Sequence, residues 1–318
     1  MAAITLYNSR PGFIDRHGVG EDALDKTIDA MIKVYNQTPL QGAMFFRTVS
    51  AKGGTYKESG YGNDLPLPPK NEDSDALPFA VPSADFPKEI TLATRRLAVQ
   101  VERAYPEDQL HDIARKQMSG LLRVGRLAVE YQMADIWNNA TTASGYDGGD
   151  GVSWANDSHP YRRRAQGTWD NLETASALTS ATFSTARTNL RKRTDTRGYP
   201  NMLMVRLLVV PADLERKARE LKTAEKVSEN ALNQPWVFGS DDWTFKVYDF
   251  QTDTNAWTLV GGIPEENKGM IFVEKVRPNI APTTGGDRST DIIWGQRLRM
   301  RTGAGHRVCY ELQHNIGA

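Results

Sequence analysis

The sequence predicts a mixed α+β fold, and three parts of the 318-residue chain carry that prediction. Residues 106–140 repeat apolar side chains at helical spacing over an unusual length. Two extended segments, 44–49 and 89–105, flank a long stretch rich in Gly, Pro, Asn, Asp and Ser, which is typical of strands joined by a long loop. A helix-strand-helix pattern follows over 179–222, and strand-like segments dominate the rest of the chain.

The N-terminal part predicts an arm without a core of its own. Residues 1–20 are irregular, and residues 21–39 form a short amphipathic helix with one apolar stripe, made of Leu24, Ile28, Met31, Ile32 and Tyr35. This helix cannot bury its stripe alone, so we expect it to lie on another surface. The segments 44–49 and 89–105 are then expected to pair as an extended β-hairpin around the Pro/Gly-rich loop.

The stretch 106–140 predicts one long helix. Pro106 suits the first helical position, and Glu107 and Asp108 suit the positive N-terminal end. Two neighbouring apolar stripes run along it, and Gly120 and Gly125 weaken the helix slightly. A helix of this span is about 50 Å long, and we expect it to serve as a spine.

The second half predicts an α/β layer followed by strands. Thr179 or Ser180 caps a helix that turns Phe183, Ala186 and Leu190 inward, and Gly198 and Pro200 end it. A buried strand over 201–210 and a second helix from Pro211 follow. Further strands are expected at 242–250, 256–262, 269–276, 291–303 and 306–313.

The composition argues against several classes of function. The chain carries 39 Lys and Arg against 39 Asp and Glu, so no overall attraction to nucleic acid is expected. The single cysteine, Cys309, cannot form an intrachain disulfide or a thiolate metal cage, and it is expected to be a small buried residue. The five histidines show no metal-ligand spacing. We therefore expect no metal and no cofactor.

The chain shows no sign of a membrane or a secretory route. It contains no apolar run of roughly 20 residues, the length needed to span a bilayer. The N-terminus lacks the basic and apolar regions of a signal peptide, so use in a cytoplasm-like setting is expected.

The stretch SHPYRRRAQGTWDN, residues 158–171, is the most site-like part of the sequence. His159 follows Asp157 and Ser158, but neighbours in an extended chain point apart, so a catalytic triad is disfavoured. Arg162, Arg163 and Arg164 either hold phosphates or form ion pairs between subunits, and the acidic residues nearby favour the ion pairs. No phosphate-binding loop, HExxH or GxSxG motif is present.

Several phrases, taken in order, resemble a known family. They are SWANDSHP followed by GTWDNL, then LRKRTDTRGYPNMLMVRLLVVPADLERKARELK, then ALNQPWVFG, and finally RLRMRTGAGHRVCYELQHNIGA. Together with the arm, hairpin, long helix, α/β layer and closing strands, they resemble the tailed-bacteriophage major capsid protein family, whose fold is the Hong Kong 97 type. Within that family, the phrases resemble the Mu-like head subunit and its relatives.

The resemblance implies an architecture and a function. Residues 1–42 would be an N-terminal arm, 43–104 an extended β-hairpin loop over a neighbouring subunit, 105–180 with 270–318 a peripheral domain containing the spine helix, and 181–269 an axial domain. Hexamers and pentamers of the chain would build the icosahedral shell that encloses double-stranded DNA without sequence-specific binding. No active site is expected.

The resemblance also implies assembly surfaces and partners. The expected assembly interface comprises the hairpin residues Tyr56, Lys57, Tyr61, Leu65, Leu67, Lys70, Leu77, Phe79 and Phe86, together with Arg162, Arg163 and Arg164. A portal, a separate scaffolding protein and a decoration protein are the expected partners. Some members crosslink a lysine to an asparagine between subunits. Lys57 and Lys70 lie in the hairpin, but no partner is identifiable, so no crosslink is expected.

Three other hypotheses remain open. The chain could build an encapsulin-like nanocompartment around an enzyme instead of DNA. It could be a hydrolase that uses His159 with Ser158 or Asp157. It could be a DNA-binding module, although its zero net charge argues against this.

Overall fold

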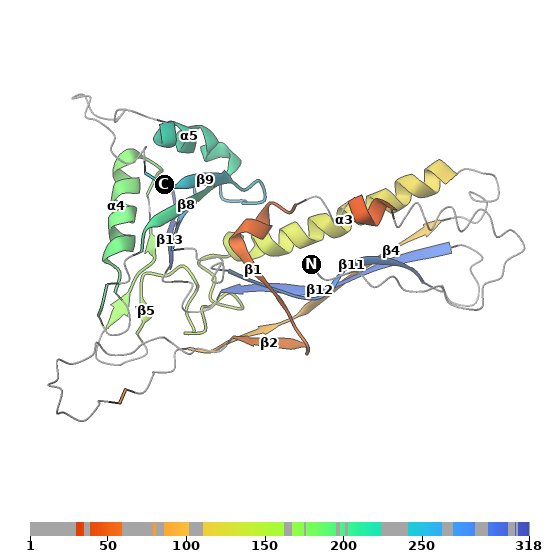
Figure 1. Cartoon of the computed structure of the whole chain (residues 1–318), viewed down its shortest axis with the longest axis horizontal. Coiled ribbons are helices and arrows are strands. Elements are labelled where there is room, and N and C mark those ends of the chain that lie inside the picture. The colour runs from red at the N-terminus through yellow and green to blue at the C-terminus, as the bar shows by residue number, and fades with distance from the viewer. Residues whose placement is uncertain are drawn as a thin grey trace, which may run out of the picture. The chain divides into compact units, whose positions relative to one another are not determined.

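The structure is a computed structural model, and Figure 1 shows its elements. It describes residues 30–34, 39–58, 79–80, 86–101, 111–161, 167–174, 176–194, 198–200, 203–223, 241–262, 270–283, 292–304, 309 and 311–317. The chain divides into two compact units. One comprises Met1–Pro39, Arg96–Arg126 and Pro278–Arg297, and the other comprises Leu40–Arg95, Leu127–Arg277 and Leu298–Ala318.

Runs of strands are separated by single helices or short helical segments along the described chain, as is typical of an α+β fold. The helical elements are η1 Gly42–Phe45, α3 His111–Asn138, α4 Ser180–Lys192, η2 Ala212–Leu214 and α5 Glu215–Thr223. The strands are β1 Phe46–Ser50, β2 Thr55–Glu58, β3 Lys88–Thr91, β4 Ala93–Val101, β5 His159–Pro160, β6 Thr168–Trp169, β7 Leu172–Glu173, β8 Val205–Val210, β9 Thr244–Val247, β10 Trp257–Gly261, β11 Met270–Thr283, β12 Ile292–Ala304 and β13 Leu312–Asn315.

The predicted long helix is confirmed as α3, which has 28 residues and is therefore about 42 Å long. Its predicted start at Pro106 lies outside the described residues. Gly125 has a packing role here, because a Cβ at this position would come within 1.9 Å of Nε2 of Gln296 on β12. No described helix, α3 included, is both long enough and apolar enough to cross a membrane.

Strand β1 differs from its predicted pairing. It runs parallel to β11, with Phe46 opposite Met270 and Ser50 opposite Glu274, in a four-stranded sheet of order β1-β11-β12-β4. The antiparallel hairpin is formed instead by β2 and β3, where Tyr56 lies opposite Ile90. The expected pairing of 44–49 with the later extended segment is therefore wrong. Alternating hydrophobicity identifies a strand, but it does not identify the partner.

The two faces of this sheet bury different groups. One face packs Phe46, Phe272 and Met300 with Val129 and Met133 of α3 in the main core. The other face carries a smaller core, formed by Ala51, Ile90, Leu92, Ile271 and Val273. The hairpin approaches closely there, because a Cβ on Gly303 of β12 would lie 2.4 Å from Cδ1 of Ile90.

The predicted α/β layer is confirmed as a five-stranded sheet of order β7-β13-β10-β8-β9, with α4 and α5 drawn beside it (Figure 1). Thr179 caps α4, since its Oγ1 accepts from the Thr182 backbone N–H while the Thr182 side chain accepts from the Thr179 N–H. Phe183, Ala186 and Leu190 are buried as expected. The last strand starts later than predicted, at Leu312, because Cys309 and Glu311 have helical backbone.

Candidate functional site

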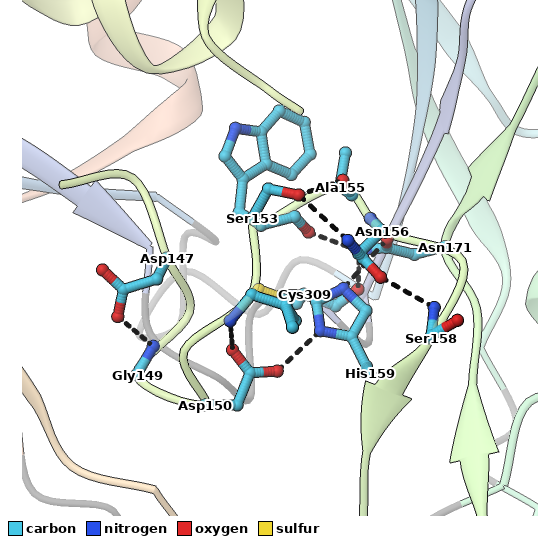
Figure 2. A network of polar contacts seen from close by, with 12 residues as sticks. Asp147, Gly149, Asp150, Ser153, Ala155, Asn156, Ser158, His159, Asn171 and Cys309 are labelled. Atoms are coloured by element: carbon cyan, nitrogen blue, oxygen red, sulfur yellow. Dashed lines mark hydrogen bonds and ion pairs between the residues drawn. The ribbon is translucent and has the colours of Figure 1, made fainter. Parts of the chain in front are cut away.

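His159 lies in a buried polar network (Figure 2). Its Nδ1 is 2.7 Å from Oδ2 of Asp150, and both side chains are fully buried. Its Nε2 is 3.1 Å from Oδ1 of Asn171. The Asn171 amide donates its N–H groups to the carbonyls of Trp154 and Cys309, so its oxygen faces His159 and accepts from Nε2. Partners on both sides thus fix the orientation of the imidazole.

Trp169 extends this network into a stack. The His159 ring lies 4.2 Å from the Trp169 ring at an angle of 14°. The guanidinium of Arg193 lies 5.3 Å from the centroid of the same indole. Arg193 is itself buried, and it donates to the Leu312 carbonyl at 2.8 Å and to Oε1 of Gln313 at 2.5 Å. The stack therefore joins β5 and β6 to the C-terminal end of α4 and to β13.

The geometry does not support the hydrolase hypothesis. Ser158 donates its hydroxyl to Asp157, 2.8 Å away and exposed, while both ring nitrogens of His159 face other residues. Ser158 and His159 are adjacent in sequence, but their side chains hydrogen-bond to other residues and not to each other. Cys309 is fully buried, and burial raises the pKa of its thiol far above the usual range, which disfavours the thiolate. Within the described part of the chain, no group of His, Cys, Asp and Glu is arranged to hold a metal ion.

A buried lysine fastens the hairpin to the same loop region. Lys88, the first residue of β3, places its Nζ 2.5 Å from Oδ1 of Asp147, and its side chain is only 7% exposed. The other carboxylate oxygen of Asp147 accepts from the Gly149 N–H at 3.1 Å. Gly149 has φ of +98°, and a Cβ there would lie 2.9 Å from the Pro87 carbonyl oxygen. The base of the hairpin is thus held on the loop that supports the His159 network.

The described members of the expected assembly interface differ in exposure. Tyr56 is half-buried over Ile90, and its hydroxyl donates to Glu58 at 2.6 Å. Lys57 is exposed and lies 3.4 Å from Glu89 across the hairpin. Phe79 is 96% exposed, and Phe86 is half-buried. An exposed phenylalanine is the kind of side chain that a subunit contact would cover.

The other expected interface residues lie outside the described part of the chain. They are Tyr61, Leu65, Leu67, Lys70, Leu77, Arg162, Arg163 and Arg164. Their role in assembly remains a proposal.

The sequence analysis missed most of the buried network. Asp150 and Asn171 are twelve or fewer residues from His159 in sequence, but nothing in their spacing marks them as its partners. Lys88 and Asp147 are separated by 59 positions. The one usable signal was the glycine-rich stretch around Asp147 and Asp150, which indicates a tightly folded loop whose carboxylates can accept from backbone N–H groups.

A second buried histidine, His314 on β13, is held in the neutral form. Its Nδ1 is 2.8 Å from the hydroxyl of Thr258, and its ring lies 5.3 Å from that of Trp154. Burial lowers the pKa of His314 to about 4, against a small opposite effect of Asp253.

We predict that this histidine destabilises the subunit as the pH falls from about 6.5 to about 4. The unfolded chain takes up the proton first because its histidine has the higher pKa. The stabilising contribution is therefore complete above pH 6.5 and is lost as the pH falls, by roughly 3 kcal/mol in total. Denaturant unfolding at several pH values measures the free energy of unfolding of the subunit as a function of pH. Below pH 6.5 this free energy is expected to fall less steeply with pH in His314→Gln than in the wild type. An equal dependence on pH in the two proteins would contradict the prediction.

Comparisons with known proteins point to one family. A family model described as "Phage capsid protein" matches residues 108–311. No curated protein matches the chain. Similar solved structures include the procapsid of bacteriophage JBD30, at 12% identity and a TM-score of 0.51, covering 94% of this chain and 75% of that one. The capsid of an empty GTA particle has 11% identity and a TM-score of 0.51, covering 89% of this chain and 91% of that one.

An encapsulin is similar to the same degree. The SrpI encapsulin complex from Synechococcus elongatus has 12% identity and a TM-score of 0.51, covering 88% of this chain and 87% of that one. At these identities the structural likeness establishes the fold, which is the predicted capsid type.

Proposed function

The chain belongs to the phage capsid protein family, and we propose that it is the major capsid protein of a tailed bacteriophage, a structural protein without enzymatic activity. Its copies assemble into the icosahedral shell that encloses the double-stranded DNA genome. The single observation that carries this proposal is the family match, which covers residues 108–311 and so includes the long helix α3 and every described element from β5 to β12.

The physical chemistry of the chain suits a shell subunit. A two-stranded hairpin such as β2–β3 is marginally stable alone, and it gains stability when a neighbouring subunit covers its edges. Many weak contacts of this kind, repeated over a closed shell, give a durable particle. Within this proposal the arm is 1–42, the extended loop 43–104, the peripheral domain 105–180 with 270–318, and the axial domain 181–269.

The proposal extends to partners and place of assembly. Hexamers and pentamers form in the host bacterial cytoplasm with a portal and a separate scaffolding protein, and a decoration protein can bind the finished head. The zero net charge supports a shell that encloses DNA without holding it tightly, because the genome must enter and leave.

A nanocompartment shell is the second candidate, and the likeness to the SrpI encapsulin favours it. The two candidates differ in their content. A phage head made with its packaging partners contains DNA that is protected from nuclease, whereas a nanocompartment contains protein. Measuring the nucleic acid in nuclease-treated particles therefore separates the two.

Electron microscopy of the purified chain tests the shell function itself. The expected result is shells, tubes or hexamers in negative stain, because a shell subunit associates through the same surfaces with or without its packaging partners. Persistent monomers at high concentration, with the fold intact by circular dichroism, would count against the proposal.

A further inference from the structure

The hydrogen-bond partners of His159 determine how many protons its ring carries. On one side lies the Asn171 amide, whose orientation is fixed by three neighbours. The Asn156 backbone N–H donates to its Oδ1 at 2.7 Å, and its Nδ2 donates to the carbonyls of Trp154 and Cys309 at 2.7 and 3.2 Å. Nε2 of His159, 3.1 Å from this Oδ1, therefore faces an acceptor and must carry a proton.

The other ring nitrogen faces a carboxylate. Nδ1 of His159 lies 2.7 Å from Oδ2 of Asp150, and neither side chain is exposed. A neutral imidazole has only one N–H. With the proton on Nε2 it would turn a lone pair toward the carboxylate, and with the proton on Nδ1 it would turn a lone pair toward Asn171. Neither neutral tautomer fits this site while Asp150 is ionised.

Two contacts favour the charged form of the pair, with the proton on the ring and not on the carboxyl. Val152 donates its backbone N–H to the other oxygen of Asp150 at 3.4 Å, which suits an acceptor-only carboxylate. The His159 ring stacks 4.2 Å from Trp169, and the electron-rich face of an indole stabilises a cation within about 6 Å. Hydrogen bonds that satisfy the remaining atoms, such as Nε2, support a buried ion pair further.

Other titratable and charged groups surround the pair on several elements. They are Asp157 and Asp170, both exposed on the same segment, Arg193 at the end of α4, Lys88 of β3 with its partner Asp147, Cys309, and His314 on β13. Burial, followed by the Asp150 charge, raises the pKa of the Cys309 thiol, whereas Lys88 and Arg193 lower it. The two cations favour an ionised Asp150 and oppose a further positive charge on His159. The direct contact of 2.7 Å with Asp150 outweighs them, because the Coulomb energy falls with distance.

We infer that His159 is a doubly protonated imidazolium in the folded subunit, and that Asp150, His159 and Asn171 form a proton lock that opens when this proton is lost. Figure 2 shows the three residues together. Loss of the proton leaves a lone pair opposite Asp150 or Asn171, and any movement of the ring disturbs its stack on Trp169. The lock is independent of the shell function. It responds to alkaline conditions, whereas His314 responds to acid.

The direction of the pH effect follows from the proton count. A histidine of the unfolded chain loses its proton at about pH 6.5, whereas the folded lock keeps it. The stabilising contribution is therefore complete below about pH 6.5 and is lost as the pH rises. While the folded subunit holds one proton more than the unfolded chain, the unfolding equilibrium constant rises about tenfold for each pH unit. Cys309 adds to this trend above about pH 8, because burial raises the pKa of its thiol, so the test is confined to about pH 7–8.

Ring NMR of the wild-type subunit tests the proton count directly. With ¹⁵N-labelled histidine at about pH 7, both ring nitrogens of His159 are expected to carry a proton. The ring then gives two one-bond N–H signals, which are assigned by their through-space contacts with the Trp169 indole. A single N–H signal from this ring would overturn the inference. Magic-angle spinning gives the same readout if the chain is obtained only as assembled particles.

Asp150→Asn removes the lock without emptying the site. The new amide can donate through Nδ2 to Nδ1 of a neutral ring, whose Nε2–H still donates to Asn171. This variant is expected to show one ring N–H and to lose the rise of about tenfold per pH unit in the unfolding equilibrium constant. Ser158→Ala, whose hydroxyl lies at the exposed surface, is the matched control and is expected to keep both wild-type features. If Asp150→Asn unfolds with the same pH dependence as the wild type, the proton lock is wrong.

Discussion

Replacing His159 with alanine is expected to lower the free energy of unfolding of the subunit by about 3–5 kcal/mol. The substitution removes the imidazole that faces the buried carboxylate of Asp150, 2.7 Å away. It also removes the ring that stacks on Trp169 and the donor to Asn171. Breaking a buried pair by deleting one partner is costly because the remaining charge loses its compensation. Denaturant unfolding followed by tryptophan fluorescence gives the value.

Ser158→Ala is the matched control, because the Ser158 hydroxyl donates to Asp157 at the exposed surface and not to the buried network. Its expected effect is within about 0.5 kcal/mol. The double variant Asp150→Ala with His159→Ala is expected to cost less than the two single changes added together, since neither charge is then left alone. Unfolding of His159→Ala at the wild-type denaturant concentration would contradict this account. A hydrolase that uses Ser158 and His159 would instead lose an activity in both variants.

Replacing Gly149 with alanine is expected to destabilise the hairpin anchor by about 2–4 kcal/mol. At φ of +98° a side chain is strained, and the new Cβ would lie 2.9 Å from the Pro87 carbonyl oxygen. Relief of that clash moves either Pro87 and Lys88 or the loop that holds Asp147. Hydrogen exchange of the β3 amides is expected to speed up, and assembly is expected to weaken.

Gly151→Ala is the matched control that separates the backbone strain of a positive φ from the steric clash with Pro87. Gly151 has φ of +88°, yet a Cβ there has no heavy atom within 4 Å. It is expected to cost about 1–2 kcal/mol, with the β3 amides unchanged. Equal costs for the two variants, or unchanged exchange of β3 in Gly149→Ala, would show that Gly149 is not part of the anchor.

The sequence predicted those elements that are specified by residues close to one another in the chain. Helix α4 begins at Ser180 after the capping residue Thr179 and buries Phe183 and Leu190, because caps and helical periodicity are encoded within a few residues. The pairing of β1 with β11 joins residues more than 200 positions apart, so no local pattern could reveal it. The late start of β13 was missed for a different reason, because residues 306–313 have a strand-like hydrophobic pattern although Cys309 and Glu311 have helical backbone.

From the sequence alone, the only part of the candidate site that could be predicted was that it is not a catalytic triad. Adjacent positions for Asp157, Ser158 and His159 already argued against a triad, and the structure gives His159 other partners. These partners are Asp150, which lies in a loop, and Asn171, which lies between β6 and β7. They come together with His159 only in the folded chain. The role of Arg193 could not be predicted either. The sequence places it just after α4, where a basic residue usually interacts with the C-terminus of the helix. In the structure its guanidinium lies over the Trp169 indole instead.

The measurement that tests the central claim most directly is a cryo-electron microscopy reconstruction of the particles that this chain forms. The account predicts a closed shell in which the connection 59–87 of each copy crosses onto an adjoining copy. A reconstruction in which this connection folds against its own subunit and touches no other copy would contradict it.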